Sequence, residues 1–594
     1  NNAPFMTYNQ GHLGITVTRL LFLILATSCA TGGTDSEKSG TRALEYDTAS
    51  VTYHTDGDGS GDGSGGEGAN GEPYVQSLSL DVSELTMTTR ADEARTHRFK
   101  LLANWSDGRI SPVEEGIEWR VNDIRVGTID GDGRFTTSTL RGGQVGIIAE
   151  HNGKTAIGTV VVRYVGTMIT DGVDPSLFAV AEVPASGTGM LYPLDGVVVP
   201  KNQPSMHFQW QDLGGVAYRL QFQSEVTELT VYSTSLDWIS DTELWPVICE
   251  SNAGFTIETT LSARVGDQVM VKDPQTMTVQ DLEAIGSIIY WTPTAQGLME
   301  IPYGESARSF LTQAETGRCV GCHAVSSQGM VAFTYDGGSA PLGMKTIDGL
   351  EDRIPYGGGG NSNYKVFSPD GSLLLAGLNG TLSLFDGVTG AFLSNPTIEG
   401  ASWVNNMDWA PDDSYLVFVD SPGTGYDLTF SGGRIMRAPH LGGGSFGPAE
   451  EIVNVSDLVA PYGFSNVYYP AVSPDSKWVL FNASTGDSYD DPDASLFVVP
   501  IEGGTPIELA KANQDYSQAN SLPKWAPATS GDDIWWFAFA SRRNYGTNTA
   551  GNPQIWMSSF DPAEAEAGFD PSSTSIWMSS QNPSQNNHIP LWVP

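Results

Sequence analysis

The stretch Val366-Phe-Ser-Pro-Asp-Gly-Ser-Leu-Leu-Leu-Ala376 has the pattern of a short strand, a Pro-Asp-Gly turn and a second, apolar strand. The same pattern recurs along the second half of the chain, and a further short strand follows most copies. Aligned on the proline of the turn or its equivalent, the copies are centred on Ser327, Pro369, Pro411, Pro474, Pro527 and Pro594. A sequence that repeats a few short strands in this way predicts a series of similar small sheets.

Six copies predict a six-bladed β-propeller over residues 286–594. The Ser-Pro-Asp-Gly turns resemble those of the TolB-like, WD40-like (PD40) propeller family, and this resemblance covers about half of the chain. The last copy has no room for its outer strands. We expect the apolar hairpin of residues 286–302 to pair with the C-terminal strand and close the ring. In the alternative, this hairpin ends the preceding domain and the closure is looser.

The composition excludes some classes of function. The chain has 594 residues, with 30 Lys plus Arg and 69 Asp plus Glu, so its net charge is −39. That charge argues against a nucleic acid as partner, because binding a polyanion needs a basic face. The hydrophobic share of 40% is enough for packed cores, and the 68 Gly and 34 Pro favour short strands and turns. The fold class predicted is all-β.

Two smaller domains precede the propeller. Residues 74–166 alternate polar and apolar side chains, and motifs such as Trp105-Ser-Asp-Gly108 and Ile117-Glu-Trp119 resemble the bacterial Ig-like (group 2) domain. Residues 167–285 contain Met206-His-Phe-Gln-Trp210 and Tyr218-Arg-Leu-Gln-Phe222, which predict paired strands of a fibronectin- or Ig-like sandwich. The complete prediction is therefore two Ig-like sandwich domains followed by the propeller.

The N-terminal segment indicates export. Residues 1–29 hold a charge, a short apolar run and Cys29, the order of a signal peptide. Because it ends at a cysteine, the segment resembles a bacterial lipoprotein signal, which implies lipid attachment at Cys29; an ordinary signal peptide is the alternative. Residues 30–73, rich in Gly, Asp and Ser, predict a flexible linker. We expect an exported protein of the cell envelope, at the outer membrane or cell surface, that meets the membrane only through the lipid.

The motif Cys319-Val-Gly-Cys322-His323 lies between the hairpin and the first copy. Two thiols at this spacing add to the two vinyl groups of haem, and the adjacent imidazole ligates the iron. We therefore expect haem c bound covalently through Cys319 and Cys322, with His323 as iron ligand. A disulfide or dithiol is the second interpretation. A zinc site is the third, and it needs a fourth ligand such as the distant Cys249 or a histidine.

A second iron ligand is predicted from the repeat alignment. His323 lies four residues before its turn position, and His588 lies six residues before its own, on the innermost strands of the first and last copies. These blades are neighbours in a closed ring, so we expect both imidazoles to reach one iron. The alternative for His588 is a strand-edge histidine bonded to backbone. Met344 and His440 are weaker candidates, and an iron with five ligands is also open.

These features lead to two functional hypotheses. The first is electron transfer or redox sensing at the envelope by a haem-bearing propeller. The second is a non-enzymatic scaffold whose propeller binds an unknown protein or glycan and whose two cysteines form a disulfide. The sequence contains no recognised catalytic motif, so we expect a binding or redox protein rather than an enzyme.

Overall fold

The structure is a computed structural model that describes residues 72–421, 427–489, 491–514, 518–528 and 532–594. The predicted signal peptide with Cys29 and almost all of the predicted linker lie outside the described residues. Within them the chain is nearly all β, as predicted, and the helices are short. None of these helices has the length and apolar content needed to cross a membrane.

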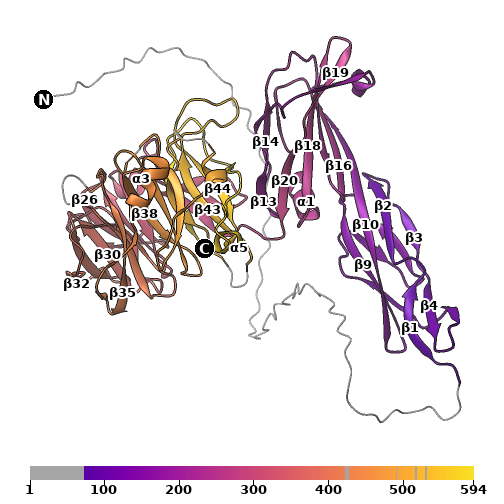
Figure 1. Cartoon of the computed structure of the whole chain (residues 1–594), viewed down its shortest axis with the longest axis horizontal. Coiled ribbons are helices and arrows are strands. Elements are labelled where there is room, and N and C mark those ends of the chain that lie inside the picture. The colour runs from indigo at the N-terminus through magenta and orange to yellow at the C-terminus, as the bar shows by residue number, and fades with distance from the viewer. Residues whose placement is uncertain (1–71, 422–426, 490, 515–517, 529–531) are drawn as a thin grey trace, which may run out of the picture. The chain divides into compact units, whose positions relative to one another are not determined.

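The first strands form two small sheets and part of a large one (Figure 1). One small sheet has the order β1 (Val75–Leu80), β4 (Leu101–Trp105), β5 (Ile110–Val113). The other has the order β3 (Thr96–Arg98), β8 (Arg134–Thr137), β7 (Gly127–Ile129). The strands that join the large sheet are β2 (Glu84–Arg90), β6 (Glu118–Val121), β9 (Gly143–His151) and β10 (Lys154–Ile169).

Strand β10 belongs to both predicted sandwich regions. It pairs with β2 and β9 along its first part and, through Tyr164–Ile169, with Thr227–Tyr232 of β16 (Thr227–Ser233). Alternate residues from Ala156 to Tyr164 are buried. The alternation that favours a strand therefore continues, without a turn, up to the point where the pairing with β16 begins. The predicted boundary between residues 166 and 167 therefore falls inside a continuous strand.

The second region contributes two layers of strands. The large sheet continues with β11 (Glu182–Ala185), β13 (Val197–Pro200), β15 (Tyr218–Gln223), β18 (Thr256–Val265), β19 (Gln268–Lys272) and β20 (Gln275–Gln280). A separate sheet has the order β12 (Met190–Tyr192), β14 (His207–Trp210), β17 (Asp237–Ile239). Helix α1 (Leu244–Ser251) packs into their shared core and carries Cys249, which is 0% exposed, as expected for a small hydrophobic residue.

The prediction that residues 206–210 and 218–222 pair with each other is wrong. β14 pairs with β12 and β17, whereas β15 pairs with β16 and β18. The turn between them takes the chain from one layer to the other, and its Asp212 accepts hydrogen bonds from Gly214 N and Tyr218 Oη. The two strands instead meet through side chains, with the rings of Phe208 and Phe222 5.1 Å apart and edge to face.

From Ser287 onward the described residues form six antiparallel sheets, the β-propeller, seen as the brown to yellow arrows of Figure 1. The first four, from the innermost strand outward, are as follows: β46 (His588–Val593), β21 (Ser287–Thr292), β22 (Gly297–Pro302), β23 (Arg308–Leu311); β24 (Val320–Val325), β25 (Met330–Tyr335), β26 (Ala340–Thr346), β27 (Asp352–Ile354), with β28 (Asn361–Ser362) on β26; β29 (Lys365–Phe367), β30 (Leu373–Leu378), β31 (Thr381–Asp386), β32 (Phe392–Ser394); β33 (Val404–Trp409), β34 (Tyr415–Asp420), β35 (Arg434–Gly442), β36 (Ser445–Phe446), with β37 (Glu450–Val453) on β35.

The remaining two sheets follow the same plan: β38 (Asn466–Val472), β39 (Trp478–Ser484), β40 (Ser495–Pro500), β41 (Ile507–Glu508); β42 (Ser521–Trp525), β43 (Trp535–Ser541), β44 (Gln554–Phe560), β45 (Ile576–Trp577). Short helices α3 (Ser456–Tyr462) and α4 (Ala510–Asn513) connect successive sheets, and α5 (Pro562–Glu566) lies between β44 and β45 of the last one. Between β23 and β24 lies the short helix α2 (Gln313–Thr316), which is capped by Thr312 and Glu315.

The turns that define the repeat are built in the same way in different sheets. Ser368 Oγ donates to the Asp370 carboxylate at 2.6 Å, and Ser473 Oγ donates to the Asp475 carboxylate at the same distance. Each aspartate thus fixes the tight connection between the innermost strand and its neighbour. This repeated connection sets the six innermost strands at equivalent positions.

The innermost strands contact one another in a closed cycle: β24 with β29, then β33, β38, β42, β46 and again β24. The cycle closes because β46 pairs antiparallel with β21, so the C-terminal strand completes a sheet begun by the hairpin before the first copy. This confirms the prediction that the hairpin of residues 286–302 pairs with the C-terminal strand. Trp592 of β46 is 5% exposed and donates from Nε1 to Ile285 O at 2.8 Å.

Removing residues 588–594 is expected to lower the melting temperature by at least about 5 °C, because it exposes the inner edge of β21 and the pocket of Trp592. Calorimetry on the full chain measures this shift. A chain that lacks only Pro594 serves as the matched control, and equal melting temperatures for both deletions would contradict a closing role for β46.

Candidate functional site

A cavity of about 630 Å³ lies where the six innermost strands converge. Equivalent residues of the six copies line its walls at the same depth. Each such set of residues is called a level and is placed by the number of residues that separate it from the turn position. The proline level contains the turn residues Ser327, Pro369, Pro411, Pro474, Pro527 and Pro594. The aromatic level, two residues earlier, contains Val325, Phe367, Trp409, Val472, Trp525 and Trp592.

Two deeper levels follow. The charged level, three and four residues before the turn position, contains His323, Lys365, Asp408 and Lys524 among smaller or apolar neighbours. The tyrosine level, five residues before it, contains Cys322, Tyr364, Asn406, Tyr469, Leu522 and Ile589. At about 3.3 Å per residue, the levels together span roughly 16 Å of strand.

The tyrosine level is also a level of β-bulges. The pairing register shifts there in the innermost strands β24, β33, β38, β42 and β46. Asn406, Tyr469, Leu522 and Ile589 have φ values of 39°, 51°, 58° and 56°, in the left-handed region that side chains rarely adopt. Each such residue costs about 1–3 kcal/mol, and bulges typically redirect side chains next to binding sites.

Tyr469, one of the redirected residues, contacts a second tyrosine of the same level. The hydroxyls of Tyr364 and Tyr469, from sheets that are not neighbours in the ring, lie 3.3 Å apart. Burial raises the pKa of both phenols, so both remain protonated and can donate. Tyr469 and Leu522 line the large cavity and also a small pocket of about 20 Å³ that contains His588. The tyrosine level therefore lies between the large cavity and this small pocket.

Lys365 is almost fully buried at the charged level, with 7% of its surface exposed. Its Nζ donates to the carbonyl oxygens of Cys322 at 2.7 Å and Asn363 at 2.6 Å. Burial lowers the pKa of Lys365 from its ordinary 10.5 to about 8, so the side chain is mainly an ammonium at neutral pH. One of its three N–H groups remains after these two bonds.

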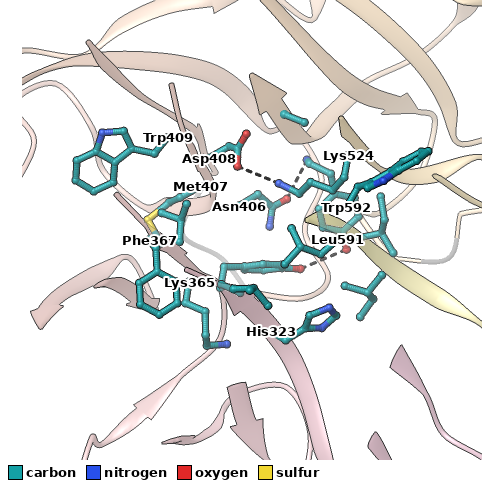
Figure 2. A pocket seen from close by; sticks show the side chains of 18 of the residues that line it. His323, Lys365, Phe367, Asn406, Met407, Asp408, Trp409, Lys524, Leu591 and Trp592 are labelled. Carbon is teal, nitrogen blue, oxygen red and sulfur yellow. Dashed lines mark hydrogen bonds and ion pairs between the residues drawn. The ribbon is translucent and has the colours of Figure 1, made fainter. Parts of the chain in front are cut away.

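Lys524 and Asp408 form an ion pair, with Nζ and Oδ1 3.0 Å apart (Figure 2). The second carboxylate oxygen of Asp408 accepts from Val472 N at 2.8 Å, which ties this aspartate of β33 to the neighbouring innermost strand β38. The ammonium of Lys524 donates one N–H group to this pair, which leaves two N–H groups. Figure 2 shows Lys524, Asp408 and Lys365 around the same space.

His323 is uncharged at neutral pH. Burial, together with the charges of Lys365 and Lys524, lowers its pKa to about 4. Its Nε2 lies 3.3 Å from Ile289 O, which assigns the proton to Nε2 and leaves Nδ1 as an acceptor. Nδ1 is buried and has no hydrogen-bond partner among the described residues, and the same holds for Oδ1 of the fully buried Asn363.

The net charge of the charged side chains that line the cavity is positive, opposite in sign to the net charge of the chain. Among its described lining residues there are two lysines and one aspartate, while the whole chain carries a net charge of −39. The sequence analysis did not single out Lys365, Lys524 or Asp408. The signal was present in the repeat alignment, where these residues replace the apolar residues at equivalent positions of other copies.

The two cysteines of the motif have different surroundings. Cys322 and His323 line the cavity, whereas Cys319 is not among the lining residues. Cys319 lies beside Asp336, and burial together with this carboxylate raises the pKa of its thiol. The motif runs into strand β24, where residues three apart point to opposite faces. Both thiols are free.

This arrangement fits a haem only in part. One thiol and the neighbouring imidazole face a cavity of suitable size, but the second thiol does not, so two thioether bonds to one porphyrin require the segment before β24 to rearrange. His588 is not among the described residues that line this cavity: it lines the small pocket, and its ring is tilted against Trp291 with 4.8 Å between centroids. Met344 is fully buried in a sheet core, and His440 pairs with Asp413 at 2.9 Å.

Comparisons with known proteins give neighbours among solved structures only. No family model and no curated protein sequence matches the chain. Among solved structures it is similar to putative TolB from Agrobacterium tumefaciens, with 16% identity, TM-score 0.31, and coverage of 52% of this chain and 97% of that one. It is also similar to TolB from Acinetobacter baumannii, with 14% identity, TM-score 0.36, and coverage of 58% and 80%. We take the architecture from the strand pairing described above.

The buried position of Lys365 predicts an unusual titration. After reductive ¹³C-methylation of the full chain, one lysine signal should titrate near pH 8, below the ordinary lysine pKa of 10.5, and should disappear in Lys365→Arg. Since the folded pKa is below the unfolded one, stability should rise with pH between about 8 and 10.5. A Lys365 signal that titrates with the exposed lysines would contradict the burial described here.

Proposed function

We propose that this protein is a binding protein whose propeller takes a small anionic ligand in its central cavity. The observation that carries the proposal is the local surplus of positive charge at Lys365 and Lys524 in a strongly acidic chain. Lys365 is buried, which is costly for a charge, whereas Lys524 is 29% exposed and already paired with Asp408. The net charge of +1 that remains on the lining is most simply balanced by a bound anion. The volume of about 630 Å³ is in the ordinary range for small-molecule sites.

Two buried acceptors without partners among the described residues indicate a bound water or a ligand group that donates hydrogen bonds, which a carboxylate itself does not supply. Asn363 Oδ1 and His323 Nδ1 are buried acceptors with no donor among the described residues. Buried acceptors in folded proteins are nearly always satisfied by protein, water or ligand. The strained bulges of the tyrosine level support the same conclusion, because such backbone is concentrated at sites of function.

We infer further that the six sheets are the blades of one closed six-bladed propeller and that the strands before residue 286 are two Ig-like modules that carry it. The support is the closed cycle of innermost strands and the two-layer packing of β14 against β15. We also propose that the protein works outside the cytoplasm as a lipoprotein attached through Cys29. That part rests on the sequence of residues 1–29 alone.

The charge proposal predicts opposite effects for two substitutions. With octanoate as the probe and octylamine as its cationic counterpart, the full chain should bind octanoate in preference, as measured by calorimetry. Lys524→Met removes one positive charge and should weaken octanoate binding about tenfold, while Asp408→Asn removes the opposing charge and should strengthen it.

The control for these variants is Lys477→Met, at a side chain that is 70% exposed on a turn. It should leave octanoate binding unchanged. Because damage to the fold does not tighten binding, the gain in Asp408→Asn separates an electrostatic effect from a structural one. Equal affinity for octanoate and octylamine would refute the anionic assignment.

Covalent haem, with electron transfer or redox sensing, is a second candidate function. It is supported by Cys322 and His323 lining one cavity, and it is opposed by the position of Cys319 outside that cavity. When bound, the group would supply one-electron chemistry. The residues of this chain that would hold it are Cys319, Cys322 and His323.

Expression with haem-maturation machinery tests this candidate. Covalent haem predicts a Soret band that survives denaturation and acid-acetone extraction and that is lost in Cys322→Ala but retained in Cys249→Ala. Intact mass that shows free or mutually oxidised thiols would end the haem proposal and leave the anion-binding proposal standing.

A further inference from the structure

We propose that the ligand of the central cavity is an aliphatic 2-hydroxycarboxylate, bound by its carboxylate and hydroxyl at the ion pair of Lys524 and Asp408 and by its chain at the opposite half of the ring. This rests on the proposed function and adds the chemistry of the rest of the ligand. The observation behind it is that the lining residues three positions before the turn differ in chemistry around the ring. Three neighbouring innermost strands carry the ion pair, and the other three carry only apolar side chains at this position.

The ion pair occupies the half of the ring formed by β33, β38 and β42. Asp408 of β33 and Lys524 of β42 are separated by β38, whose residue at the same position is Ala471. Because Ala471 is small, the two longer side chains can meet across this strand, with Nζ and Oδ1 3.0 Å apart (Figure 2). The side chain of Lys524 is 29% exposed and that of Asp408 is 20% exposed, so both present surface to the cavity that they line.

The half of the ring formed by β46, β24 and β29 is apolar at this position. Its residues there are Leu591, Ala324 and Val366, of which Leu591 and Val366 are partly exposed on the lining. Two residues before Leu591, Ile589 is also partly exposed on the lining. These aliphatic side chains, unlike the nearly buried rings of the aromatic level, leave surface that a guest can cover. Covering it with an aliphatic chain is favourable, because the gain follows the apolar area removed from water.

The ion pair requires an acceptor and a donor side by side in the ligand. Lys524 retains two N–H groups, which the oxygens of an anion can accept. Asp408 offers only acceptor oxygens, and a ligand carboxylate has no hydrogen to donate to them. Since the two charged atoms of the pair are 3.0 Å apart, the donor must lie next to the carboxylate of the ligand, as the hydroxyl of a 2-hydroxy acid does.

The net charge of the lining favours a hydroxyl over an ammonium as this donor. A 2-amino acid also has a donor beside its carboxylate, but it is a zwitterion and leaves the charge of the buried Lys365 without a counterion. A 2-hydroxy acid makes the same two contacts and keeps its negative charge. The acceptors Asn363 Oδ1 and His323 Nδ1, which have no donor among the described residues, show that the lining lacks donors elsewhere as well.

The test is calorimetry on the full chain with matched probes. 2-Hydroxyoctanoate should bind about tenfold more tightly than octanoate, because its hydroxyl donates to a charged acceptor. 2-Oxooctanoate, which has an acceptor in place of the hydroxyl, should bind no more tightly than octanoate. Lactate, which has the same head group without the chain, should bind at least about tenfold more weakly than 2-hydroxyoctanoate. The zwitterion 2-aminooctanoate should also bind more weakly than 2-hydroxyoctanoate.

A pair of variants assigns the hydroxyl preference to Asp408. Asp408→Leu removes the acceptor and keeps a side chain of similar size, so it should bring the affinity ratio of 2-hydroxyoctanoate to octanoate to roughly 1. Asp281→Leu is the matched control, because Asp281 pairs with Lys201 at the same distance of 3.0 Å and is not among the described lining residues, so the ratio should be kept. Circular dichroism confirms that each variant is folded, and the probe comparison on the unsubstituted chain stands without them.

The outcomes separate this inference from the proposed function. Equal affinity for 2-hydroxyoctanoate and octanoate, with octanoate still preferred to octylamine, overturns the hydroxyl contact and leaves anion binding intact. Equal affinity for lactate and 2-hydroxyoctanoate overturns the placement of the chain at the apolar half of the ring. Tighter binding of 2-aminooctanoate than of 2-hydroxyoctanoate overturns both this inference and the anionic assignment. A hydroxyl preference that persists unchanged in Asp408→Leu overturns the placement of the head group at the ion pair.

Discussion

The pairing of β46 with β21 is the contact on which the cavity depends, because it brings the C-terminal strand beside the strands that precede the first copy. Every wall of the cavity comes from one innermost strand, so a ring left open at this seam would have a gap between β46 and β24. The pairing is itself stabilised by burial of Trp592 and by the apolar face of the hairpin. Binding chemistry and ring closure therefore share the same residues.

The repeat explains both the regularity and the chemistry of the site. A turn position shared by the six copies, with Ser327 in the first and proline in the others, puts equivalent residues at equivalent depths. A substitution in one copy therefore changes one sector of one level. Lysine in two copies and aspartate in a third are enough to give the charged level its character. The bulges with positive φ change the direction of side chains that a regular strand would leave in the alternating pattern. They turn Tyr469 and its counterparts toward the axis of the ring of innermost strands.

The sequence predicted the all-β class, the repeat and the partner of the first hairpin, because these depend on local patterns and on counting strands. It did not predict that β10 passes through the expected boundary at residue 166, since alternation shows where a strand lies but not which sheets it joins. The prediction that His323 and His588 bind one iron shows a second limit, which is that counting residues along a strand does not reveal a bulge. His323 and His588 differ by two positions relative to their turns, and with a bulge between those positions they line different cavities. The short cysteine spacing likewise gave no information on the strand geometry that separates the two thiols.

The long strand β10 has a mechanical consequence. With sixteen residues it is about 50 Å long, and hydrogen-bonded neighbours from both N-terminal modules are attached to it. Bending or twisting between the modules would have to break ladder bonds instead of rotating a few loop dihedrals. The pair should respond to load as a single stiff beam with no hinge at its middle.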